Sequence, residues 1–188
     1  MTRGMIEMAE GNFARGEKML ARAASTSDSP LFNYLQAARA AHLQGQNERR
    51  DEWLRLAYQE IPEAANAVLL TQADFQLDQG QHEQALATLR RLDENSKDHG
   101  HALGLMGRLY YQLEDWAALS ELLPRVRKHA QVKAETLLQW ELRVLREQID
   151  AAADADAITA AWKAVPKKMK QEIVLQVAYY DGLMRTDQ

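Results

Sequence analysis

The sequence has no cysteine, and only four prolines and nine glycines among its 188 residues. Without cysteine the chain can form neither disulfides nor thiolate metal sites, and it has no thiol nucleophile. The scarcity of proline and glycine argues against a β-sandwich or a barrel, because the many turns of those folds need both residues. A formal net charge of −4 gives no general reason to expect nucleic-acid binding.

The sequence also lacks a long apolar segment. No apolar run approaches the roughly 20 residues that span a bilayer, and no signal-like segment follows Met1. Alanine, leucine, glutamine, glutamate and arginine dominate instead, and all of them are good helix formers. The composition therefore predicts a soluble, all-helical chain.

One segment recurs four times, at residues 9–20, 43–54, 78–89 and 113–123. Its turn residue is Gly11, Gly45, Gly80 and Glu114 in turn, at spacings of 34, 35 and 34 residues. A small residue stands seven positions before each turn, and a leucine nine positions after it. The small residues are Gly4, Ala38, Ala73 and Gly107, and the leucines are Leu20, Leu54, Leu89 and Leu123. Such a register predicts repeated helical hairpins.

Each column of the repeat has a physical reason. Glycine ends the first helix in the left-handed conformation that other residues resist, so Glu114 is expected to make a strained turn. The small residue lets the second helix approach closely, and burial of each leucine contributes roughly 1.5–3 kcal/mol. The extra residue in the spacing of 35 is placed in the loop around residues 61–63, because loops tolerate insertions.

We therefore predict an all-α, right-handed α-solenoid of about eleven helices. Residues 1–130 are assigned to four hairpins, of which the first lacks its beginning. Residues 131–188 continue the stack with helices at 132–149, 158–165 and about 167–184, joined by a connector at 153–157. The last helix is expected to leave an apolar face exposed or covered by a second copy of the chain, formed by Ile173, Val174, Val177 and Leu183.

A period of 34 residues with small, aromatic and leucine positions resembles the tetratricopeptide repeat. The third and fourth copies, with GQHEQAL (80–86) and LYYQLEDW (109–116), match that family best. Gly16, Arg50 and Leu119 depart from it, since each stands where the family prefers alanine. The departures affect single copies, and the register of the four copies persists.

Longer segments resemble the HemY family of proteobacteria, which are tetratricopeptide-repeat proteins encoded in haem-biosynthesis operons. The segments are RGMIEMAEGNF (3–13), NYLQAARAA (33–41), WLRLAYQEIP (53–62) and AWKAVPKKMKQEIVLQVAYYDGLM (161–184). The resemblance implies that the chain is the middle of a protein with two N-terminal inner-membrane helices and a cytoplasmic repeat region. It also implies a link to late haem biosynthesis, through scaffolding of enzymes or handling of tetrapyrroles.

The concave face of such a stack is lined by the first helix of each hairpin. Residues facing this groove follow each small packing residue and recur around it at helical intervals. The predicted groove residues are Phe32, Gln36, Arg39 and His42, then Thr71, Asp74 and Asp78, and then His101, Leu105, Arg108 and Tyr111. Arg39, Asp74 and Arg108 occupy equivalent positions, so the charges alternate along the predicted groove.

No catalytic or metal-binding motif accompanies these residues. His99 and His101 are the only close histidine pair, and they lack the CxxCH or HExxH context of a haem or metal site. We therefore expect a non-catalytic protein-interaction scaffold without a metal or cofactor, whose partners include haem-biosynthesis enzymes and not nucleic acid. Membrane attachment is expected only through an anchor outside this chain. The alternative is a haem- or porphyrin-binding module of the same pathway.

Overall fold

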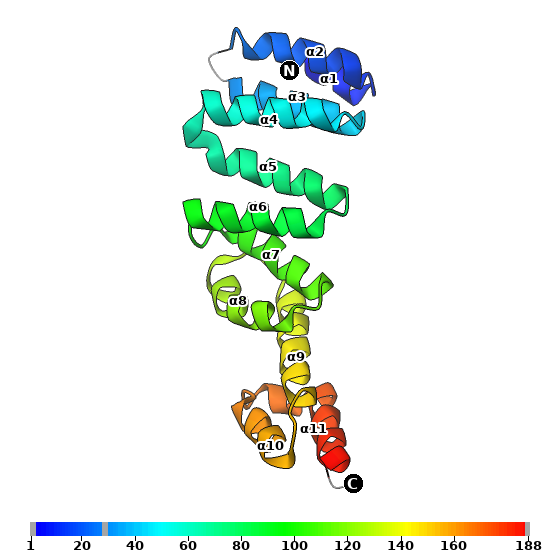
Figure 1. Cartoon of the computed structure of the whole chain (residues 1–188), viewed down its shortest axis with the longest axis vertical. Coiled ribbons are helices and arrows are strands. Elements are labelled where there is room, and N and C mark those ends of the chain that lie inside the picture. Colours follow the sequence, from blue (N-terminus) through cyan, green and yellow to red (C-terminus); the bar gives the residue numbers. More distant parts are fainter. Residues whose placement is uncertain (1–2, 28–29, 187–188) are drawn as a thin grey trace. The chain divides into compact units, whose positions relative to one another are not determined.

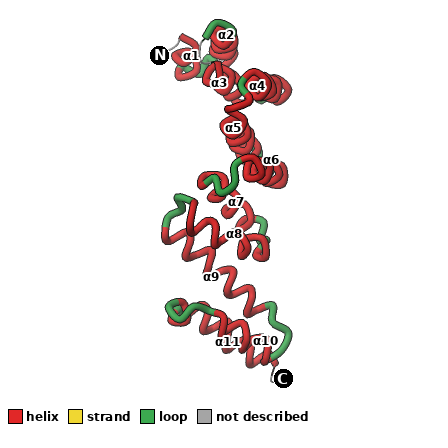
Figure 2. The backbone as a smooth tube through the Cα atoms, turned by 90° about the vertical axis from the view of Figure 1, so that its left-hand side faces the viewer, coloured by secondary structure: helices red, strands yellow, loops and turns green. Residues whose placement is uncertain are grey.

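The computed structural model describes residues 3–27 and 30–186. Over these residues the chain forms eleven α-helices, two short 3₁₀ helices and no strand (Figures 1 and 2). This confirms the all-α, solenoid-like fold and the expected number of helices.

Helices and short loops alternate along the whole described chain. The first part comprises α1 (Arg3–Ala9), α2 (Phe13–Ala24), α3 (Pro30–Leu43), α4 (Asn47–Glu60), the 3₁₀ helix η1 (Pro62–Ala64), α5 (Ala65–Asp78) and α6 (His82–Asn95). The second part comprises α7 (Gly100–Gln112), α8 (Trp116–His129), α9 (Ala134–Asp150), α10 (Ala155–Ala164), the 3₁₀ helix η2 (Met169–Gln171) and α11 (Ile173–Thr186).

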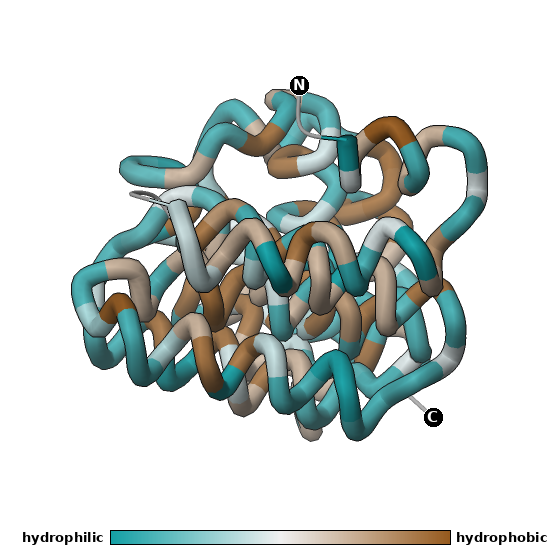
Figure 3. Tube along the Cα trace, turned by 90° about the horizontal axis from the view of Figure 1, so that it is seen from above, coloured by the Kyte–Doolittle hydropathy of each residue, from teal (hydrophilic) through white to brown (hydrophobic). Residues whose placement is uncertain are grey.

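The helices form two compact units. Helices α1–α6 belong to Met1–Lys97, and α7–α11 belong to Asp98–Gln188. Within each unit every helix packs against the next one along the chain. The first helices of the second and third hairpins, α3 and α5, also contact each other. Apolar and polar residues alternate along the helices (Figure 3), as expected where each helix buries one stripe.

The corners of the first four hairpins all lie in the left-handed backbone region. The φ angles are 81° at Gly11, 71° at Gly45 and 69° at Gly80. Glu114 adopts the same conformation, with φ of 55°, although it has a side chain. Because L-residues resist this region, the strained fourth turn expected from the sequence is confirmed.

The small and leucine columns lie where the helices approach each other. A Cβ atom added to Gly4 would lie 2.8 Å from Cγ of Leu20, so the first helix has room only for glycine there. Ala38 and Ala73 are completely buried. Gly107 differs, because an added Cβ would overlap the ring of Trp140 on α9. In the fourth hairpin the small residue therefore accommodates the next hairpin.

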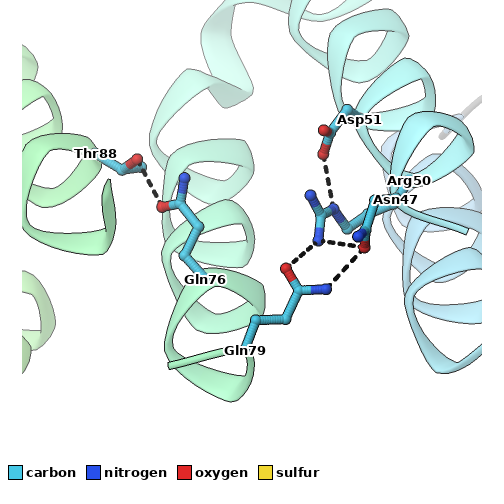
Figure 4. Close-up of polar contacts among 6 residues, drawn as sticks. All are labelled: Asn47, Arg50, Asp51, Gln76, Gln79 and Thr88. Atoms are coloured by element: carbon cyan, nitrogen blue, oxygen red, sulfur yellow. Dashed lines mark hydrogen bonds and ion pairs between the residues drawn. The ribbon is translucent and has the colours of Figure 1, made fainter. Parts of the chain in front are cut away.

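A buried arginine explains one departure from the tetratricopeptide pattern. Arg50 on α4 is 7% exposed, and its guanidinium donates to Asp51 at 2.7 Å, to Asn47 at 3.1 Å and to Gln79 at 2.9 Å. Gln79, at the end of α5, donates in turn to Asn47 at 2.7 Å. Figure 4 shows this network beside the contact of Thr88 with Gln76. Arg50 therefore links the second hairpin to the third.

A buried carboxylate links the first hairpin to the second in the same way. Glu17 on α2 is 1% exposed. It accepts hydrogen bonds from Gln44 at 2.9 Å, from Nε of Arg49 at 3.0 Å and from the indole of Trp53 at 2.9 Å. A buried charge is tolerated only when it is paired and hydrogen-bonded, as here. These contacts fix the position of α2 against α3 and α4.

The extra residue of the second repeat lies where the sequence placed it. Residues 62–64 form the 3₁₀ helix η1 between α4 and α5, whereas the described residues between α2 and α3 form no helix. The insertion is thus absorbed by a tighter local turn, and α5 resumes the repeat register with Ala73 buried.

The C-terminal part differs from the expectation in three places. The expected helix over 167–184 is interrupted, because the chain forms η2 and then starts α11 at Ile173. Helix α10 begins inside the expected connector, at Ala155, because the side chain of Asp154 accepts from the amide of Ala157 and caps it. Leu183 does not lie on an exposed face, since it packs against the core cluster that includes Leu175.

The rest of the predicted apolar face on α11 is exposed. Ile173 is 75% exposed and Val177 is 50% exposed, and Val174 is also exposed. Tyr180 and Met184 extend the same face at helical spacing. None of the described helices is both long and apolar enough to cross a bilayer.

The left-handed corners predict opposite changes in stability for substitutions at Glu114 and Gly80. Replacing Glu114 with glycine should raise the free energy of unfolding by about 1 kcal/mol, because glycine adopts this conformation without a Cβ clash. Replacing Gly80 with alanine should lower it by about 1 kcal/mol. No atom lies within 4 Å of a Cβ at Gly80, so that cost is purely conformational. Chemical denaturation followed by circular dichroism measures both, and a loss of stability in Glu114→Gly would contradict the assignment.

Candidate functional site

The structure brings three predicted groove residues of the first unit together around one ring. The His42 imidazole stacks on the ring of Phe75, with centroids 4.5 Å apart and an angle of 18° between the planes. The Arg39 guanidinium carbon lies 5.9 Å from the same ring centroid. Oδ2 of Asp78 lies 3.5 Å from Nε2 of His42. We call this cluster of Arg39, His42, Phe75 and Asp78 the α3–α5 face.

Phe75 is the member of this face that the sequence prediction omits. It is almost completely buried on α5, and it lies outside the helical intervals around Asp74 that define the predicted groove. Its ring nevertheless forms the floor on which the two basic side chains of α3 lie. A flat aromatic floor with a cation above it is a favourable arrangement. The face therefore combines a rigid apolar base with charged groups at its surface.

The imidazole of His42 is held in its neutral form. Burial is the largest cause that lowers the pKa of His42 from its ordinary value of 6.5, and the positive charge of Arg50 lowers it further. The nearby Asp78 carboxylate raises this pKa, but its effect is smaller. Nδ1 of His42 is buried and has no hydrogen-bond partner among the described residues. The neutral ring therefore serves as a packing surface on Phe75.

The other predicted groove residues of the first unit lie outside this cluster. Phe32 is 50% exposed on α3, and Gln36 is half-buried one turn further along. The Thr71 hydroxyl donates to the carbonyl of Ala67 within its own helix, at 2.8 Å. Asp74 is half-buried on α5.

The second unit contains a cleft between its first helices α7 and α9. The cleft has a volume of about 730 Å³, and residues 129 and 131–133, at the connection from α8 to α9, contribute to its lining. Three of the four groove residues predicted in this hairpin line it: His101, Leu105 and Arg108. Side chains from the connection between α8 and α9 and from α9 itself complete the lining. We call this site the α7–α9 cleft.

The ionisable side chains that line the α7–α9 cleft are two permanent cations and two imidazoles. They are His101, Arg108, His129 and Lys133, and no aspartate or glutamate lines the cleft. The carboxylate of Asp98 lies 3.7 Å from His129, but it is also bound to Arg125 at 2.7 Å. The cleft therefore has a positive potential within a chain whose total charge is negative.

The apolar wall of the cleft is rigid. Leu105 is 7% exposed and Trp140 is 5% exposed, and both contribute to the lining together with Val132. The Trp140 ring packs against Gly107, where even a Cβ atom would overlap it. Because the indole is wedged between α7 and α9, it forms a fixed wall of the cleft.

Two residues singled out in the sequence lie outside the cleft lining. Tyr111 is at the far end of α7, where its ring meets Trp116 edge to face with centroids 5.5 Å apart. The Nδ1 atom of His99 accepts a hydrogen bond from the amide of Ala102 at 3.4 Å and caps α7. The pair His99–His101 is thus divided between a helix cap and the cleft.

The arrangement of both sites favours binding of a charged partner. Among the residues that the structure describes, no group of three or more histidine, aspartate and glutamate side chains is placed to hold a metal ion. The α3–α5 face offers an arginine above a buried ring, and the α7–α9 cleft offers the cations of Arg108 and Lys133 beside an apolar wall.

Comparison with known proteins supports the family resemblance seen in the sequence. Residues 1–45 match the family model described as "HemY protein N-terminus". The chain is 27% identical over 187 residues to Protein HemY from Escherichia coli K12, and the proteins of that name from Escherichia coli O157:H7 and Shigella flexneri give the same values. The match covers 97% of this chain and 47% of each relative. The chain thus spans about half the length of the curated relatives it matches.

The depressed pKa of His42 predicts acid sensitivity of the first unit. Below pH 6.5 the unfolded chain protonates this imidazole while the folded chain keeps it neutral, so the unfolded state binds more protons. The free energy of unfolding should therefore fall as the pH is lowered from 7 to below 6. His42→Phe should reduce that pH dependence, because it keeps a ring on Phe75 and removes the titrating group.

The matched control is His82→Gln, which removes an imidazole from the start of α6 in the same unit. This variant should keep the pH dependence of the wild type. Urea denaturation at a series of pH values measures the effect, and an unchanged pH dependence in His42→Phe would refute the assignment.

Proposed function

We propose that this chain, which resembles the HemY family along its length, is a non-catalytic scaffold associated with haem biosynthesis. The resemblance to that family supports the association with the pathway. The proposed scaffold binds a partner protein through the first helices of its hairpins, and enzymes of haem biosynthesis are the partners we propose. Its proposed location is the cytoplasmic face of the inner membrane, as the family resemblance implies.

The observation that carries this proposal is the presence of exposed arginines on the first helices of two hairpins. Arg39 and Arg108 follow the small packing residue in their respective hairpins, and both are exposed. Arg39 belongs to the α3–α5 face, and Arg108 lines the α7–α9 cleft. In contrast, the buried charges Glu17 and Arg50 are occupied by contacts between hairpins. Exposed arginine next to an apolar base is typical of residues that dominate protein interfaces.

Charge reversal at the two arginines tests the scaffold function. Partners of the protein in its native membrane are captured by photo-crosslinking and identified for wild type, Arg39→Glu, Arg108→Glu and the double variant. Each reversal removes a favourable charge contact and creates a repulsive one, so each should lower the crosslinked yield. We expect a loss of about tenfold in the double variant.

The matched control reverses two charges on second helices, with Arg55→Glu on α4 and Lys128→Glu on α8. Both side chains are exposed and lie on helices that do not form the predicted groove. This control should retain the crosslinks. Unchanged crosslinking in a correctly folded Arg39→Glu/Arg108→Glu variant would reject the proposed binding surface.

The alternative function, a haem- or porphyrin-binding module, has one observation in its favour. His101 and His129 both line the α7–α9 cleft, so two imidazoles face the same space. Titration with haemin would then give a saturable Soret shift that weakens in His101→Ala/His129→Ala. His99→Ala is the matched control, because His99 caps α7 and does not line the cleft. Absence of a Soret shift would exclude this alternative.

A further inference from the structure

We propose that the α7–α9 cleft binds an acidic peptide segment with interspersed apolar side chains, supplied by the partner protein. This inference rests on the proposed scaffold function and specifies the chemistry of one of its surfaces. It concerns only the second unit, since every residue of the cleft lies between Gly100 and Trp140.

The distribution of charge is the first argument. His101 and Arg108 come from α7, His129 from the end of α8, and Lys133 from the residue before α9. The two permanent cations, Arg108 and Lys133, thus come from different elements, and the imidazoles of His101 and His129 complete the polar lining. Since no carboxylate lines the cleft, an anionic ligand would meet complementary charge both from α7 and from the residue before α9. Cations spread in this way suit several carboxylates along a chain better than a single anionic group.

The apolar part of the lining is the second argument. Leu105 and Val132 provide aliphatic surface between the cations, and Trp140 closes the wall. A volume of about 730 Å³ lies within the usual range of ligand sites, roughly 300–1,000 Å³. A peptide can place an apolar side chain on this wall while its carboxylates meet the basic groups, which gives both affinity and register.

The state of the aromatic and imidazole groups favours a peptide over a flat ring system. Trp140 is pinned against Gly107 and only 5% exposed, so little of its face is free for stacking. His129 is in contact with Asp98, so ligation by this imidazole would compete with an existing interaction. These constraints disfavour a tetrapyrrole held between two histidines, whereas Arg108 and Lys133 supply the charge that would bind carboxylates.

Gly104 contributes backbone surface to the lining of the cleft. It lies on α7 one turn from both His101 and Arg108, and it lines the cleft. An added Cβ would meet only Cγ2 of Val132, at 3.5 Å, which is an ordinary contact. Alanine should therefore fit at this position, whereas a larger side chain would project into the cleft. This difference provides a steric test that does not change any charge.

The experiment measures fluorescence anisotropy of a fluorescein-labelled, glutamate-rich peptide with interspersed leucines, titrated with the whole chain. The reference probe is the same peptide with lysine in place of glutamate. The glutamate peptide should bind saturably, and its affinity should fall as salt rises. The lysine peptide should not bind. Arg108→Glu/Lys133→Glu should weaken binding of the glutamate peptide by about tenfold or more.

Two matched pairs of variants separate the cleft from the general charge of the unit. Lys128→Glu/Lys163→Glu reverses two exposed charges of the same unit outside the cleft and should change the affinity by less than about twofold. Gly104→Leu should block the cleft and weaken binding, whereas Gly104→Ala should retain it. Circular dichroism of each variant confirms that the helices are intact.

Three results would overturn the inference. They are absence of binding of the glutamate peptide to the wild type, equal affinity in wild type and Arg108→Glu/Lys133→Glu, and saturable haemin binding in the cleft that the peptide does not displace.

If any of these occurs while Arg39→Glu still loses the crosslinked partner, the cleft assignment fails and the scaffold function stands. If Arg39→Glu and Arg108→Glu both retain the partner while the cleft binds the peptide, the scaffold proposal fails instead.

Discussion

Each of the first four hairpins depends on a backbone reversal in the left-handed region. The corner residue fixes the rotation of the second helix relative to the first, and therefore which stripe of each helix is buried. Three corners use glycine, which adopts this conformation freely. Glu114 adopts it at a conformational cost that packing of the α7–α8 hairpin must offset. The same register that buries Leu89 on α6 leaves Arg39 exposed on α3, so the corners determine the surface as well as the core.

Register between hairpins is specified by buried polar contacts in addition to apolar packing. Alanine at the position of Arg50 would pack closely but would bind no particular partner. Arg50 instead needs Asn47 and Gln79 in one arrangement, and a half-satisfied guanidinium in the interior would cost several kcal/mol. Glu17 likewise needs Arg49 as its hydrogen-bond partner. A wrong alignment of neighbouring hairpins would leave both charges buried without partners, so these networks select the native stacking.

Sequence reasoning predicted the features that depend on local periodicity. The corners, the buried leucines and the inserted turn at η1 all follow from spacing, and the structure confirms them. It missed contacts that depend on which hairpins meet. Gly107 was assigned to packing within its own hairpin, yet its neighbour is Trp140, more than thirty residues later. Phe75 was omitted from the predicted groove because the groove positions were chosen at helical intervals around Asp74, and those intervals do not include Phe75. The break before α11 was missed because Glu172, which has an extended backbone just before the helix, is not a residue type that marks a helix start in a sequence.

The division between occupied and available charges links the fold to the proposed function. A charged residue on a helix can stabilise neighbouring hairpins or present its charge to a partner, and it cannot do both at full strength. Glu17 and Arg50 are buried and hydrogen-bonded to neighbouring hairpins, so replacing either of them would destabilise the stack whether or not a ligand is bound. Arg108 and Lys133 are exposed beside an apolar wall that is already rigid. Because that wall needs no rearrangement, binding of a ligand in the α7–α9 cleft would cost the protein little conformational entropy. The positions of the charges would then determine specificity.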